Sequence, residues 1–215
     1  ASQNQLAAAE VAWRSPRDTA SRNGLQDLRR SVDVNLAWLA LRTDDVQKID
    51  DLLESLLKDG KAVPAPELHR RIKLLQGVRL GNRNKLPESI AALRDADALY
   101  RSGADPLRGR VLAQLATTYA ASGALDDALR NYREALTASP DDFEVRWHSH
   151  CGLADAYRRK ESAQLASEQY AVCIEEIQAR SNELATDQGK LTFLGGFQDV
   201  YDSYLEMTYL AAAPN

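Results

Sequence analysis

Cysteine, histidine and long apolar runs are scarce in this sequence. Its 215 residues include two cysteines and three histidines, and two cysteines are too few for a disulfide framework. No run of about 18 apolar residues occurs, so we expect no membrane span. The formal net charge is -4, and acidic and basic residues are interspersed. The sequence therefore lacks the basic face or tail that is typical of nucleic-acid-binding proteins.

Helix-forming residues, in contrast, are abundant. Leucine and alanine dominate, whereas aromatic and β-branched residues are modest in number, so the composition predicts an all-α chain. The clearest pattern lies in residues 109–140, where two apolar sets at helical spacing are separated by Ser122-Gly123 and end at Pro140. The first set is Leu112, Leu115, Ala116 and Tyr119, and the second is Ala128, Tyr132 and Ala135. The small residues would let two antiparallel helices approach closely, with the tyrosines filling the space beside them.

This stretch resembles a tetratricopeptide (TPR) repeat, whose pattern runs Trp-x2-Leu-Gly-x2-Tyr, then Ala-x3-Phe, then Pro. Leu112 stands where the pattern has Trp, Ala116 where it has Gly, and Tyr132 where it has Phe. The resemblance implies a right-handed α-solenoid of antiparallel helix pairs. It also implies a non-catalytic scaffold for protein–protein interaction, without a metal or cofactor.

The same internal offsets recur along the chain. Ser89, Ala128 and Ala166 are 39 and 38 residues apart, and Ile49 precedes Ser89 by 40 residues. We therefore predict repeat units near 25–60, 66–103, 106–140 and 142–180, followed by a final long helix over 187–211. Residues 1–24 are predicted as an N-terminal helical cap, with a short helix over 5–13 and a second short turn starting at Ser15-Pro16.

A narrower resemblance concerns the C-terminal part of the chain. Phe193-Leu194 and Val200-Tyr201 match a paired pattern in CHAT-type proteins, which join TPR arrays to a caspase-like protease domain. Gly195-Gly196 departs from that pattern and predicts a kink. The alternative function is therefore a regulatory TPR module of a larger, bacterial CHAT-type protease, with the catalytic domain following Asn215.

In a TPR array the first helix of each pair lines a concave groove. Carried onto this sequence, the resemblance predicts the following groove residues: Trp38, Arg42, Arg71, Val78, Asn82, Arg110, Gln114, Thr117, His148, Asp155, Arg158 and Arg159. The predicted groove is apolar in its N-terminal half and charged in its C-terminal half, which suits a peptide with an apolar anchor and an acidic stretch. The expected partner is a separate protein or a downstream domain of the same chain.

One cluster carries side chains with catalytic or metal-binding chemistry, residues 147–151 (Trp-His-Ser-His-Cys). Zinc needs about four converging ligands, and no second Cys or His group lies nearby in sequence. We expect His148 and Cys151 to face the groove and His150 to pack inward. Cys151 and Cys173 are expected to be buried free thiols, with a bridge between them as the alternative.

Three pairs of aspartates, at 44–45, 126–127 and 141–142, are predicted helix starts. The compartment is left open: a bacterial cytoplasm is expected or, if a signal peptide was removed before Ala1, an extracytoplasmic location. The abundance of Arg over Lys fits a GC-rich bacterial genome. The sequence does not identify the partner or the oligomeric state.

Overall fold

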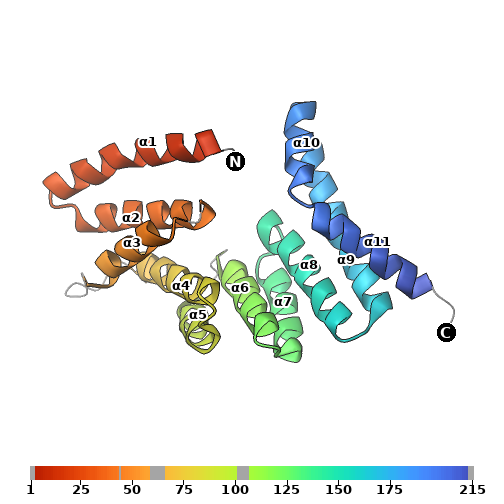
Figure 1. Cartoon of the computed structure of the whole chain (residues 1–215). Helices are drawn as coiled ribbons and strands as arrows, with labels where there is room; N and C mark the ends of the chain where they lie inside the picture. Colours follow the sequence, from red (N-terminus) through yellow and green to blue (C-terminus); the bar gives the residue numbers. More distant parts are fainter. Residues whose placement is uncertain (1–2, 44, 59–65, 101–106, 213–215) are drawn as a thin grey trace. The chain divides into compact units, whose positions relative to one another are not determined.

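The computed structural model describes residues 3–43, 45–58, 66–100 and 107–212. Within these ranges every regular element is a helix and none is a strand, which confirms the all-α prediction (Figure 1). Contacts divide the chain into two compact units, residues 1–99 and 100–215. Among the described helices none is long and apolar enough to cross a membrane.

Unit 1 is built around its second helix. Its helices are α1 (Gln3–Arg22), α2 (Gln26–Arg42), α3 (Val46–Lys58), α4 (Pro66–Asn82) and α5 (Leu86–Tyr100). Helix α2 packs against α1, α3 and α4. The core lies where these helices meet, and its fully buried residues include Val32, Ile49 and Leu75.

The N-terminal region is one continuous helix, so the predicted split near Ser15-Pro16 is wrong. Pro16 lies inside α1, although proline removes one backbone hydrogen bond from a helix interior. Packing on α2 compensates for this loss, because Ala20 is fully buried and Arg17 binds Asp33 of α2. The local signal for a break is therefore overridden by tertiary contacts.

Unit 2 contains two regular helix pairs and two further helices. These are α6 (Arg108–Ala121), α7 (Leu125–Ala138), α8 (Phe143–Arg159), α9 (Ala163–Asn182), α10 (Asp187–Gly195) and α11 (Gln198–Ala212). The turn between α6 and α7 places Gly123 at a positive φ of 85°, a conformation that glycine adopts at little cost. Helices α10 and α11 both pack against α9 (Figure 1).

The recurring position of the repeat pattern is buried in every copy. Ile49, Ser89, Ala128 and Ala166 are each at most 1% exposed. Ser89 is the polar member, and its hydroxyl donates to the Gly77 carbonyl of the preceding helix at 2.8 Å. The small side chains of Ser89, Ala128 and Ala166 let the second helices of these pairs lie close to their neighbours, whereas Ile49 fills the position in the first copy with a large apolar side chain.

The single long helix predicted over 187–211 is instead two helices. Helix α10 ends at Gly195 and α11 begins at Gln198. Two consecutive glycines favour termination because they have low helix propensity. The break also lets both flanking rings turn inward, since Phe193 and Phe197 pack in one cluster with Trp147.

Candidate functional site

Helices α6 and α8 are the first helices of consecutive pairs in unit 2, and they pack against each other. Seven of the predicted groove residues lie on these two helices. At one end of the α6–α8 face, Arg110 Nε donates to Asp142 Oδ2 at 2.7 Å. Asp142 is also the N-cap of α8, because its Oδ1 accepts from the Glu144 amide at 3.0 Å. Partial burial, the largest single influence, raises the pKa of Asp142, but the hydrogen bond and charge of Arg110 together with the Glu144 and Val145 amides outweigh it, and the net pKa is lowered.

The middle of the α6–α8 face is a three-residue hydrogen-bond cluster. Thr117 Oγ1 lies 3.1 Å from His148 Nε2 and 3.0 Å from the Tyr132 hydroxyl. The Thr117 hydroxyl also donates to the Ala113 carbonyl of its own helix at 3.0 Å. Thr117, Tyr132 and His148 therefore form one connected hydrogen-bond network between α6, α7 and α8.

Burial decides the protonation states in this cluster. It lowers the pKa of His148, against the opposing charge of Glu144, so the imidazole is neutral near pH 7. Burial also raises the pKa of Tyr132, so its phenol keeps its proton. Gln114 is half-buried on the same helix as Thr117. The middle of the face is thus polar and uncharged.

The far end of the α6–α8 face carries charge. Arg159 of α8 donates from Nη1 to the Ala120 carbonyl, near the C-terminus of α6 where a cation is favoured. Asp155 accepts from the Tyr170 hydroxyl and from Arg158 Nη2. Burial, followed by the bond to Asp155, raises the pKa of Tyr170 to about 12. The phenol therefore remains a donor that orients the carboxylate.

The charges on the α6–α8 face remain available to a ligand. The side chains of Arg110 and Arg158 are 48% and 44% exposed. Arg110 and Arg159 make the contacts across α6 and α8, whereas Arg158 pairs with Asp155 on the side of α8 that meets Tyr170 of α9. The Arg158–Asp155 pair is exposed at both residues, and exposed ion pairs of this kind are weak enough to exchange partners. The arrangement can offer forked hydrogen-bond donors to carboxylates of a bound segment.

The five groove residues predicted in unit 1 lie in different environments. Arg71 of α4 donates to Asn35 of α2 at 2.6 Å, so these two first helices also share a polar face. Trp38 is partly buried against the core and Asn82 is exposed at the end of α4. Val78 is only 8% exposed and belongs to the buried core of unit 1, so it offers little surface to a ligand. The side chain of Arg42 lies outside the described residues.

The expectation of two free thiols is also wrong. Cys151 of α8 and Cys173 of α9 form a disulfide with their Cα atoms 5.5 Å apart. Cys151 is buried beneath Trp147, Phe193 and Phe197, and therefore does not face the groove. Sequence spacing alone did not reveal this, because α10 covers the bridge only after the chain folds back. His150 turns towards α9, where Nδ1 lies 2.9 Å from Gln169 Oε1.

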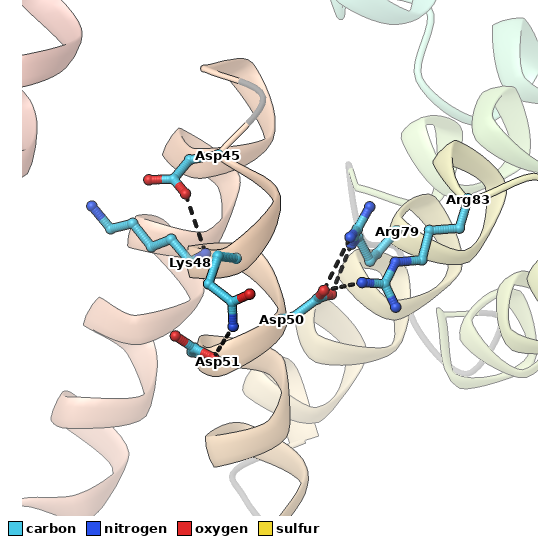
Figure 2. A network of polar contacts seen from close by, with 7 residues as sticks. Asp45, Lys48, Asp50, Asp51, Arg79 and Arg83 are labelled. Carbon is cyan, nitrogen blue, oxygen red and sulfur yellow. Dashed lines mark hydrogen bonds and ion pairs between the residues drawn. The ribbon is translucent and has the colours of Figure 1, made fainter.

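A polar network between α3 and α4 was not anticipated from the sequence. Figure 2 shows Asp50 of α3 facing Arg79 of α4 and Arg83, which follows the end of α4. Arg79 donates from Nε and Nη2 to the two carboxylate oxygens at 3.0 and 3.2 Å, and it is only 6% exposed. The forked geometry and the burial indicate that this network fastens α3 to α4.

No cluster of three or more His, Cys, Asp or Glu suited to a metal ion occurs among the described residues. Those members of the three aspartate pairs that the structure describes lie at the starts of helices. Asp126 and Asp127 occupy the first turn of α7, and Asp45 Oδ1 accepts from the Lys48 amide at the start of α3.

Comparison with known proteins relates the chain to others through its fold. No protein-family model matches the sequence, and no curated protein matches it. Among solved structures, BtubC (BKLC) from P. vanneervenii is similar, with 16% identity and a TM-score of 0.64 over 99% of this chain and 94% of that one.

Two further solved structures are similar in the same way. A putative kinesin light chain from Podosopora anserina with nearly identical TPR-like repeats matches with 16% identity and a TM-score of 0.58, over 86% of this chain and 98% of its own. MamA from MSR-1 matches with 17% identity and a TM-score of 0.51, over 80% and 98%. At these identities the likeness shows the fold alone. The chain has an all-α, TPR-like helical-repeat fold.

Proposed function

We propose that this chain is a non-catalytic scaffold that binds an acidic, extended segment of a protein partner on the α6–α8 face. The observation that carries the proposal is the meeting of predicted groove residues from two successive first helices. Thr117 contacts His148, and Arg110 and Arg159 each reach across to the other helix. A TPR-like solenoid presents its ligand surface along such first helices.

The chemistry of the α6–α8 face favours an acidic ligand. Arg110 and Arg158 are about half exposed, and Arg159 is bonded to a backbone carbonyl. A ligand carboxylate could replace Asp155, whose side chain is 55% exposed, as the partner of Arg158 without leaving a buried charge behind. The neutral Thr117–His148 centre would accommodate an uncharged part of the same segment.

The proposal is tested by selecting peptides on the purified chain from a random library and measuring their affinities. We expect enrichment of Asp and Glu around an apolar anchor. The double variant Arg110→Ala, Arg158→Ala should weaken the selected peptide by about 2–5 kcal/mol if the pairs become desolvated in the complex. Its own stability should change by only about 0.5 kcal/mol per site.

A matched control removes two other exposed guanidinium groups, in Arg130→Ala with Arg180→Ala. This control should bind the peptide as the wild type does, apart from a small effect of net charge. Equal affinities for the Arg110/Arg158 variant and the wild type would exclude the α6–α8 face as the binding surface.

The resemblance of Phe193-Leu194 and Val200-Tyr201 to CHAT-type proteins supports a second candidate function, a regulatory module of a caspase-like protease. In that case the acidic segment belongs to a downstream domain of the same chain. The solved structures compared above lend this candidate no support. Reading the codons after Asn215 decides it, because the candidate requires a caspase-like His and Cys pair downstream.

A further inference from the structure

Helix α11 has two faces of different character. Its inner face packs into unit 2: Met207 is 3% exposed, and Val200 and Tyr204 lie in the same cluster as Ala166 and Tyr170 of α9. Thr208 adds a 3.2 Å hydrogen bond to Ser167 of α9. The inner face fixes the rotation of α11, and thereby determines which side chains point away from the unit.

The outer face of α11 carries an apolar stripe. Tyr201, Leu205 and Tyr209 are spaced four residues apart, so they form one ridge along the helix. Leu205 is 65% exposed and Tyr209 is 78% exposed. Scattered exposed apolar residues are ordinary, but a contiguous ridge of large side chains is typical of an interaction surface.

A row of carboxylates runs beside this ridge. Asp199, Asp202 and Glu206 are all exposed and lie at i, i+3 and i+7 on α11. The helix sequence contains no lysine and no arginine. Among the ion pairs formed by described residues, none involves these three carboxylates. The ridge is therefore flanked by uncompensated negative charge.

The negative charge beside the ridge determines which kind of partner can bind the outer face of α11. A second copy of the chain would bring two helices together that each carry three carboxylates and no cation, which is unfavourable. An i, i+4, i+8 ridge fits the grooves of another helix. We propose that the outer face of α11 docks an amphipathic helix of a protein partner, with lysines or arginines flanking its apolar stripe. This surface is separate from the α6–α8 face.

The test uses the full chain and two synthetic amphipathic helices of about five turns. The first has a leucine stripe flanked by lysines, and the second has the same stripe flanked by glutamates. We expect the lysine peptide to bind, with affinity falling as salt rises, and the glutamate peptide to bind at least about tenfold more weakly. Hydrogen exchange should show new protection in residues 198–212.

Variants locate the binding. Leu205→Ser with Tyr209→Ser should lower the affinity for the lysine peptide by about tenfold or more. Asp202→Asn with Glu206→Gln should also lower this affinity and should make it less dependent on salt. The matched controls Leu165→Ser and Glu168→Gln, at exposed positions of α9, should leave it unchanged. All the changed side chains are exposed, and an unaltered circular dichroism spectrum verifies the fold.

Other outcomes would overturn the proposal. Equal binding of both peptides would mean that charge does not select the partner. Self-association of the free chain that Leu205→Ser abolishes would assign the ridge to a second copy. The double variant Arg110→Ala, Arg158→Ala should bind the lysine peptide with the affinity of the wild type. The α11 proposal and the α6–α8 proposal can therefore fail independently of each other.

Discussion

Unit 1 encloses charged side chains, whereas unit 2 encloses aromatic rings and a disulfide. In unit 1, Asp33 is fully buried and accepts from Arg17 Nε at 2.6 Å and Arg29 Nη1 at 3.1 Å. In unit 2, the Trp147 and Phe197 rings meet edge to face with centroids 5.2 Å apart, and this cluster covers the Cys151–Cys173 bridge.

The difference concerns how each unit tolerates loss of a contact. A buried charge is costly unless all its partners are present, so the contacts of Asp33 act as a set. Apolar and covalent contacts do not leave an unpaired charge when one of them is removed. Unit 1 should therefore be sensitive to single changes in its ion pairs, and unit 2 to reducing agents.

The largest effect is expected from removing Arg17 and Arg29, two arginines that pair with Asp33. Arg17→Ala with Arg29→Ala leaves a buried carboxylate without these partners and should cost about 3–5 kcal/mol. Chemical denaturation measures the loss, and hydrogen exchange should locate it in α1 and α2. Arg130→Ala, which removes an exposed i,i+3 pair with Asp127, is the control and should cost at most about 0.5 kcal/mol. A loss no larger than the control would show that Asp33 is not an organising charge of unit 1.

The disulfide should have the next largest effect. It joins residues 22 apart, and loop-closure entropy predicts that Cys151→Ala with Cys173→Ala destabilises unit 2 by about 3 kcal/mol. Reductant should destabilise the wild type by a similar amount and leave the double variant unaffected. Two titratable thiols in the unreduced, denatured protein would contradict the bridge.

Helices cross closely at glycines in both units. Replacing these glycines with alanine should lower the free energy of unfolding by less than the changes described above. A Cβ at Gly152 would lie 2.2 Å from Tyr132 Cζ in unit 2, and one at Gly77 would lie 2.5 Å from Leu93 Cγ in unit 1. Each Gly→Ala change should cost about 1–3 kcal/mol through overpacking. At Gly195 an added Cβ meets no atom within 4 Å, so Gly195→Ala should be neutral or stabilising by up to about 1 kcal/mol. Equal thermal shifts in all three variants would argue against the proposed crossings.

The smallest expected effect is the pH dependence contributed by His148. Because burial lowers its pKa in the folded state, the unfolded state takes up the proton first as the pH falls. This contribution to stability is present above about pH 6.5 and is lost as the pH falls towards the folded pKa. The free energy of unfolding, measured by denaturation at about pH 7.5 and about pH 5.5, should therefore fall more between the two pH values for the wild type than for His148→Gln. A larger loss in the variant would reverse the sign and contradict a neutral His148.

The amount that could be read from the sequence differs between the units. In residues 109–140 the spacing of Ala116, Tyr119, Ala128 and Tyr132 predicted a helix pair, and all four side chains are buried. The pattern was readable because helical periodicity is a local property. Asp33 and Asp50 gave no comparable signal, because Arg17, a partner of Asp33, and Arg79, a partner of Asp50, lie on other helices at separations that sequence spacing does not encode.

The sequence by itself determined that this protein is an all-α repeat chain, since the recurrence of the pattern at positions 49, 89, 128 and 166 and the residues that begin and end the helices follow from local propensity and period. It also placed Thr117 and His148 on successive first helices. Only the tertiary structure decided that these two side chains meet at 3.1 Å, that Val78 is buried, and that Cys151 is bridged to Cys173. It likewise decided which face of α11 stays exposed, because each of these outcomes depends on how one helix is rotated against another.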